Sequence, residues 1–151
     1  MSGQFSTLID ISQSRSGDCA RHLAAVMARL REAEAKYDTL ESYRGEYRAR
    51  QEAMIARGAP ASDLNNFRGF LAKLEHAIAQ QRHDVERWRQ TVLTARQDWE
   101  QAERQVRSYS VIQTQRQQAQ LQRQNRAEQK QQDEAAARGF FFGRPRLALI
   151  Q

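Results

Sequence analysis

The 151-residue sequence has few of the residues that end helices, form disulfides or fill a globular core. It contains one cysteine, two prolines and seven glycines, and aromatic residues make up only 8% of it. A single cysteine excludes a disulfide framework and a cysteine-based metal site, and it fits a reducing compartment. The sequence is instead rich in Ala, Leu, Arg, Gln and Glu, which favour helices. Elongated helices are therefore expected, since a compact domain usually needs more turn residues and more large apolar side chains.

The sequence also lacks the usual signals of an enzyme or of a membrane-spanning protein. The three histidines (His22, His76 and His83) form no pair at metal-ligand spacing, and no glycine-rich phosphate loop occurs. We therefore expect a non-enzymatic protein with no catalytic residue, no metal and no cofactor. The sequence contains no run of 18 apolar residues and begins with no basic and apolar signal segment. A cytoplasmic protein is expected.

The net charge of +6 is concentrated near the C-terminus. Residues 110–151 hold seven Lys and Arg against three Asp and Glu, whereas residues 1–57 hold nine against eight and residues 58–109 hold eight against seven. Such an excess fits an acidic protein partner, an anionic membrane or nucleic acid, and equally a solvated Arg-rich helix. Nucleic acid is the less favoured partner, because basic and acidic residues alternate as far as residue 109.

Apolar residues recur at alternating steps of three and four in both halves of the sequence, which predicts two coiled-coil helices. In the second half the a positions are Leu71, Ile78, Val85, Val92, Trp99 and Val106, and the d positions are Phe67, Leu74, Gln81, Trp88, Ala95, Ala102 and Tyr109. In the first half the a positions are Leu23, Leu30, Tyr37, Arg44 and Gln51, and the d positions are Cys19, Val26, Ala33, Leu40, Tyr47 and Met54. The first phase extends back to Phe5 and Ile9, although Ser12 and Ser16 are expected to weaken the seam there.

A turn is predicted between the two runs. Gly58 can take the left-handed conformation that ends a helix, and Pro60 prevents continuation. Ser62 or Asp63 can cap the next helix. We therefore predict a first helix over about 5–56, a turn over 57–62 and a second helix over about 63–138. A connection this short makes the helices antiparallel, so that Leu30 lies near Trp88 and Cys19 near Trp99 as a small core residue.

The predicted fold is therefore all-α: a long two-helix antiparallel coiled-coil hairpin with an overhanging C-terminal helix. The first helix can cover the second only to about residue 113. Residues 115–137 still favour helix but have almost no apolar seam, so this segment either frays or docks on a partner. Residues 139–151 are expected to form a flexible Phe/Gly/Arg tail. Within it, Phe140–Phe142 could also anchor the chain to a membrane interface or a partner groove.

Two aromatic residues near the turn, Tyr43 and Phe70, fall at g positions outside the seam. In an antiparallel pair the g positions of both helices lie along one edge. The residues at g and d on this edge, here termed the tip edge, are Lys36, Leu40, Tyr43, Tyr47, Phe70, Leu74, Ala77 and Gln81. Aromatic residues grouped on an exposed edge indicate a protein-binding patch, and shielding of the end of the seam is an equal alternative.

Four segments resemble one known family in their order and spacing. Residues 40–48 are similar to its motif L-x-x-Y-x-x-E-Y-R, and residues 67–78 resemble the opening of its second helix. Residues 85–99 follow its V-x-x-W and V-x-x-A-x-x-x-W rhythm, and residues 125–135 are similar to its C-terminal signature. The family is FliJ, the soluble coiled-coil component of the bacterial flagellar type III export apparatus, and the resemblance runs from about residue 5 to 138.

This resemblance implies a stalk that couples ATP hydrolysis to protein export at the cytoplasmic face of the inner membrane, with peripheral membrane association through the apparatus. Its chain ends would insert into the ring of the export ATPase, FliI, its tip would contact the cytoplasmic domain of the export gate, FlhA, and the family also handles export chaperones. The gate-binding residues of the family correspond to the tip edge, with departures at Lys36 and Gln81.

For the ATPase end, the polar basic helix without a seam partner suits a ring lumen. The candidate residues are Arg123, Arg126, Lys130 and Asp133. Two alternative functions remain at this point. One is the equivalent stalk of an injectisome-type secretion system, and the other is a basic coiled coil that binds nucleic acid.

Overall fold

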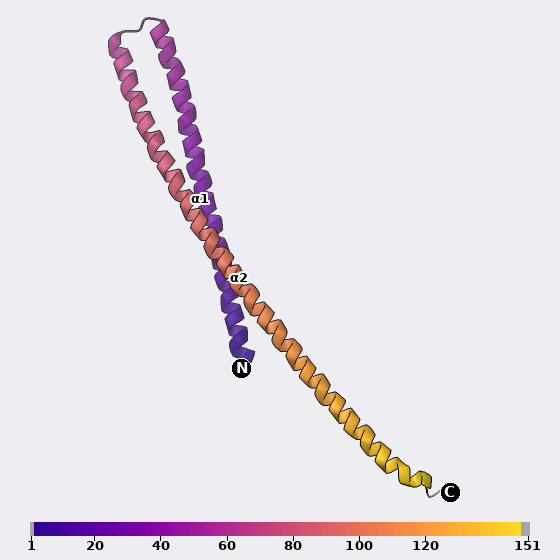
Figure 1. Cartoon of the computed structure of the whole chain (residues 1–151). Coiled ribbons are helices and arrows are strands. Elements are labelled where there is room, and N and C mark those ends of the chain that lie inside the picture. Colours follow the sequence, from indigo (N-terminus) through magenta and orange to yellow (C-terminus); the bar gives the residue numbers. More distant parts are fainter. Residues whose placement is uncertain (1, 149–151) are drawn as a thin grey trace. The chain divides into compact units, whose positions relative to one another are not determined.

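The structure, a computed structural model, describes the backbone of residues 2–148 and the side chains of residues 3–140. Two helices account for nearly all of it, α1 (Ser2–Ala56) and α2 (Ala61–Ala148), and the described backbone contains no strand (Figure 1). The helices pack together, so the predicted all-α two-helix fold is confirmed. The chain divides into two compact units. We term Asp10–Arg104 the hairpin body, and Met1–Ile9 with Gln105–Gln151 the terminal unit.

The turn at one end of the hairpin body is closed by backbone hydrogen bonds. Gly58 has a φ of 72°, the left-handed conformation that glycine adopts without a Cβ penalty. Its amide donates to the carbonyl of Ile55 at 3.1 Å, and the amide of Ala59 donates to that of Met54 at 3.1 Å. This pair of bonds is a Schellman motif, and it satisfies carbonyls that the end of α1 would otherwise leave unpaired.

The second helix begins earlier than the sequence predicted. The carbonyl of Pro60 accepts hydrogen bonds from the amides of Asp63 and Leu64, so Pro60 itself is the capping residue and α2 starts at Ala61. Ser62 and Asp63, which the sequence analysis assigned to the cap, therefore lie in the first turn of the helix. There the carboxylate of Asp63 faces the positive end of the helix dipole, which favours the helix without a capping bond.

The start of α1 and the end of α2 also differ from expectation. α1 begins at Ser2, and α2 continues to Ala148, ten residues beyond the predicted end at 138. Adding a residue to an existing helix fixes far fewer dihedrals per hydrogen bond than starting one, so the helix extends past Gly139. The flexibility of the tail stays a prediction. The side chains of Phe141 and Phe142 and the backbone of residues 149–151 lie outside the described part of the chain.

The apolar core of the hairpin body lies where the sequence placed the seam. Val26, Val92 and Ala95 form a buried cluster, against which Leu30 and Trp88 pack. Leu30 and Trp88 are one of the two pairs that the predicted register brought together. Ile78 is the most deeply buried large side chain, with 1% of its surface exposed. Every predicted a and d position between residues 19 and 109 is buried or half-buried, because the heptad phase holds along each helix.

The seam continues through the two serines that were expected to weaken it. Ser12 and Ser16 are buried, with only 4% and 6% of their surfaces exposed. The hydroxyl of Ser16 donates a hydrogen bond to the carboxylate of Glu103 on α2. A buried hydroxyl is costly only when it lacks a partner, so this bond allows the seam to continue through a small polar residue.

Within the terminal unit, the first turns of α1 pack on α2 through aromatic contacts. Phe5 meets Tyr109 edge to face, with ring centroids 5.9 Å apart, and the guanidinium of Arg116 lies 4.4 Å from the centre of the Phe5 ring. Gln113 is the last half-buried residue, as expected from the length of α1, and residues 114–140 are all exposed. None of the described helices has a stretch apolar enough to cross a bilayer.

Candidate functional site

The structure exposes the two aromatic residues that the heptad pattern left outside the seam. Tyr43 is 49% exposed and Phe70 is 44% exposed, although both are large apolar side chains. Lys36 is also exposed. The other tip-edge residues are half-buried, namely Leu40, Tyr47, Leu74, Ala77 and Gln81. The tip edge is therefore a surface with an apolar floor and two aromatic side chains that reach solvent.

Tyr47 connects the aromatic residues of the two helices. Its ring centroid lies 4.7 Å from that of Phe70 and 5.9 Å from that of Phe67, both in tilted arrangements. The guanidinium of Arg50 lies 5.1 Å from the centre of the Tyr47 ring. Ring pairs at these distances attract one another beyond simple burial, so Phe70 is held in place while 44% of its surface stays exposed. A side chain that is already fixed loses little entropy when a partner binds.

A shallow groove of about 360 Å³ lies at the other end of the tip edge. Lys36, Leu40 and Gln81 line it, together with Ala35 and Thr39. The side-chain amide of Gln81 donates a hydrogen bond to the backbone carbonyl of Ala33 on α1, at 3.0 Å. Gln81 occupies a d position, where an apolar residue is usual, and this bond satisfies its polar group there. The groove thus brings together three of the eight predicted tip-edge residues.

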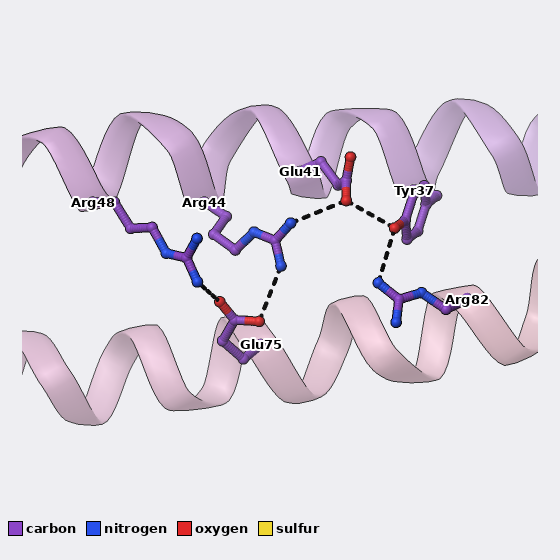
Figure 2. A network of polar contacts seen from close by, with 6 residues as sticks. All are labelled: Tyr37, Glu41, Arg44, Arg48, Glu75 and Arg82. Carbon is purple, nitrogen blue, oxygen red and sulfur yellow. Dashed lines mark hydrogen bonds and ion pairs between the residues drawn. The ribbon is translucent and has the colours of Figure 1, made fainter.

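A chain of polar contacts that the sequence analysis missed links α1 and α2 in the same part of the hairpin body (Figure 2). Its members, here termed the charge network, are Tyr37, Glu41, Arg44, Arg48, Glu75 and Arg82. The carboxylate of Glu75 accepts from Arg48 at 2.7 Å and from Arg44 at 3.1 Å. Arg44 also donates to Glu41 at 3.0 Å. Tyr37 donates to Glu41 at 2.8 Å.

The network ends on α2, where Arg82 donates to the Tyr37 hydroxyl at 3.1 Å. This hydrogen bond is the main reason why the pKa of Arg82 is raised above its ordinary value, so Arg82 stays charged across the accessible pH range. The sequence held one signal for the network. Arg44 stands at an a position, and a charged residue there needs partners of opposite charge.

The candidate ATPase residues lie in the terminal unit. Arg123, Arg126, Lys130 and Asp133 are all exposed, and their spacing of three, four and three residues places them on one face of α2. That unit also exposes apolar residues that the sequence analysis did not assign, with Leu8 at 46%, Val111 at 56% and Ile112 at 39%. The sequence could have indicated these three residues, because each is an apolar residue outside the a and d positions.

Among the described residues, no group of three or more His, Cys, Asp or Glu side chains could hold a metal ion. What the described chain does offer is an apolar aromatic edge near the turn and a polar, basic helix face near the termini. The fold defines the class: a helical coiled-coil hairpin, with the exposed aromatic residues Tyr43 and Phe70 on one edge.

Comparison with known proteins identifies the family. The sequence model of the family described as Flagellar FliJ protein matches residues 1–144, and the chain belongs to this family. Flagellar FliJ proteins of Escherichia coli and of Salmonella typhi are each 29% identical to it over 136 residues, which cover 90% of this chain and 92% of theirs.

A solved structure of a proposed YscO homolog from Chlamydia trachomatis has the same fold, with a TM-score of 0.83 and 13% identity over 97% of this chain and 91% of that one. The FliJ family is a non-catalytic component of the flagellar export apparatus, and membership of the family assigns the chain to that apparatus.

Proposed function

We propose that this protein is the stalk and adaptor of the flagellar export apparatus, which binds the export gate through the tip edge and the export ATPase through the terminal unit. In this role it couples ATP hydrolysis by FliI to export through FlhA and helps to handle the export chaperones. The observation that carries the proposal is the exposure of Tyr43 and Phe70 at g positions that the seam does not need.

The chemistry of the tip edge suits a protein partner. Tyr and Phe supply large contact areas from side chains with only two rotatable bonds, and aromatic residues are enriched in the centres of interfaces. Phe70 is already positioned by Tyr47. The half-buried Leu40 and Leu74 supply an apolar floor beside it. The tip edge is therefore the gate-binding surface, and FlhA would bury its aromatic side chains.

The terminal unit suits a looser contact. Residues 114–140 are fully helical and exposed, and residues 110–138 hold five Lys and Arg against three Asp and Glu. A polar helix without an apolar seam gains order from a partner rather than from its own chain. Arg123, Arg126, Lys130 and Asp133 are the residues that we assign to the ATPase ring. Peripheral association with the inner membrane follows from these partners.

The tip assignment is tested by measuring binding of the FlhA cytoplasmic domain by calorimetry. The double variant Tyr43→Ala/Phe70→Ala is expected to weaken binding by about 30-fold or more, which corresponds to the ~2 kcal/mol lost at an interface hot spot. Leu93→Ala is the matched control, since Leu93 is 49% exposed on α2 outside the tip edge. Equal affinities of the double variant and the wild type would refute the assignment.

The same experiment with FliI in place of FlhA tests the assignment of the terminal unit to the export ATPase. Arg126→Glu/Lys130→Glu is expected to weaken FliI binding and to reduce its salt dependence, while the affinity for FlhA stays unchanged. Arg68→Glu/Arg96→Glu reverses the same number of charges in the hairpin body and serves as the control. FliI binding that is lost equally in both double variants would show a general charge effect and remove the assignment.

A further inference from the structure

The part of the hairpin body nearest the turn is packed less tightly than the rest. We term residues 34–77 the tip segment. The structure describes all of its side chains, and none of them is fully buried. The core residues on either side of it, Ala33 and Ile78, are only 3% and 1% exposed. Apolar burial therefore holds the two helices together strongly beyond the tip segment and only moderately within it.

The charge network is the polar connection between the helices in this loosely packed part (Figure 2). Glu75 is one of its two crossing points, beside the Arg82–Tyr37 hydrogen bond, and its carboxylate on α2 accepts from two arginines of α1. Arg44 stands in the seam itself, with 22% of its side chain exposed, whereas Glu75 is 41% exposed. A half-buried arginine in a seam tolerates few arrangements of the facing helix, since another arrangement removes its partner on that helix and leaves it only Glu41 of its own helix.

We propose that Glu75 is a positioning residue for gate binding. By pairing with Arg44 and Arg48, it fixes the position and rotation of α2 relative to α1 that form the tip edge. This inference rests on the proposed function of that edge and adds a residue that does not touch the gate. A polar side chain at a single a position is known to fix how coiled-coil helices align, at some cost in stability.

The geometry explains why the position of α2 matters for the tip edge. Phe70 belongs to α2, whereas Tyr43 and Tyr47 belong to α1. The tip edge therefore exists only while the two helices keep the same position and rotation relative to each other. The Schellman turn restrains the last turn of α1, but Glu75 lies about four helical turns from Pro60 along α2. Without Glu75, the half-buried apolar contacts of the tip segment would allow α2 to roll or separate.

The first test needs no partner, so it is independent of the proposed function. Ser42 and Ala79 are replaced by cysteine in a Cys19→Ala background and spin-labelled. Pulsed electron paramagnetic resonance then reports the distance between the helices near the tip segment. Glu75→Gln is expected to broaden the distance distribution, because the amide cannot pair with both arginines. The matched control is Glu46→Gln, which removes the same charge outside the network.

Two further measurements locate the effect. A label pair at Ala25 and Gln97, beside the buried core, should keep its narrow distribution in Glu75→Gln. In 1 M NaCl the wild-type distribution at the tip should approach that of Glu75→Gln, because exposed and half-exposed ion pairs are screened at that ionic strength. An unchanged distribution in Glu75→Gln would overturn the proposal outright.

The second test measures the affinity for the FlhA cytoplasmic domain. Glu75→Gln is expected to weaken binding about three- to fivefold, as one such ion pair would, with helicity retained and Glu46→Gln unaffected. Should Tyr43→Ala/Phe70→Ala abolish binding while Glu75→Gln leaves it unchanged, the positioning role is wrong although the tip edge is right. Should the wild type fail to bind FlhA, the proposed function fails, and the role of Glu75 in gate binding fails with it.

Discussion

The conformation of Gly58 gives a prediction whose size can be worked out from the structure. Its φ of 72° lies in the left-handed region, which costs an L-residue about 1 to 2 kcal/mol. A Cβ built on Gly58 meets nothing within 4 Å, so packing adds no further cost. Replacing glycine also removes freedom from the unfolded chain, which returns roughly 0.4 to 1 kcal/mol. Gly58→Ala should therefore lower the free energy of unfolding by about 1 kcal/mol.

The same substitution at Gly69 should act in the opposite direction. Gly69 lies inside α2, and a Cβ there also meets nothing within 4 Å. Alanine in a helix interior is favoured over glycine by roughly 0.5 to 1 kcal/mol. Urea denaturation followed by circular dichroism should move the midpoints of the two variants apart, each by about 0.3 to 1 M from the wild type. Midpoints that shift in the same direction would refute the reasoning, because only the backbone conformation distinguishes the two sites.

Two other substitutions test the packing of each unit. Ile78→Ala should lower the free energy of unfolding of the hairpin body by about 2 to 5 kcal/mol, because Ile78 is almost completely buried, and a urea midpoint within 0.1 M or so of the wild type would contradict this. Phe5→Ala should speed amide hydrogen exchange in the first turns of α1, since the Tyr109 and Arg116 contacts are each worth about 1 kcal/mol. Exchange in the tip segment should stay the same, and equal acceleration there would show that the contact acts globally.

The fold could be predicted because its main determinant is periodic. Apolar residues keep one heptad phase within each helix, from Leu23 in α1 and as far as Val106 in α2, and burial in the structure follows these phases. The end of α1 was also predictable, because Gly58 and Pro60 each have a local effect on the backbone that does not depend on distant residues. The residues of the tip edge could be located for the same reason, since g positions can be counted once the heptad phase is known.

Features that depend on particular side-chain partners could not be predicted. Gln81 and Ser16 stand where the pattern expects apolar residues, and their hydrogen bonds to Ala33 and Glu103 appear only when the helices are paired. The charge network arises similarly, because the pairing of Glu75 with two arginines depends on their rotamers as well as on register. The start of α2 was missed because Pro60 supplies its cap through the backbone, which a search for capping side chains does not detect.

The exposure of residues 114–140 has a consequence for how mutations in this protein would be interpreted genetically. Arg116 packs on Phe5, but a substitution at residues 117–139 changes an exposed side chain, so one that preserves helix propensity leaves the stability of the protein nearly unchanged. A motility defect caused by such a substitution would identify a lost contact with another component, and a compensating mutation should map to that component. Defects from the seam of the hairpin body would instead mix lost contacts with lower cellular abundance.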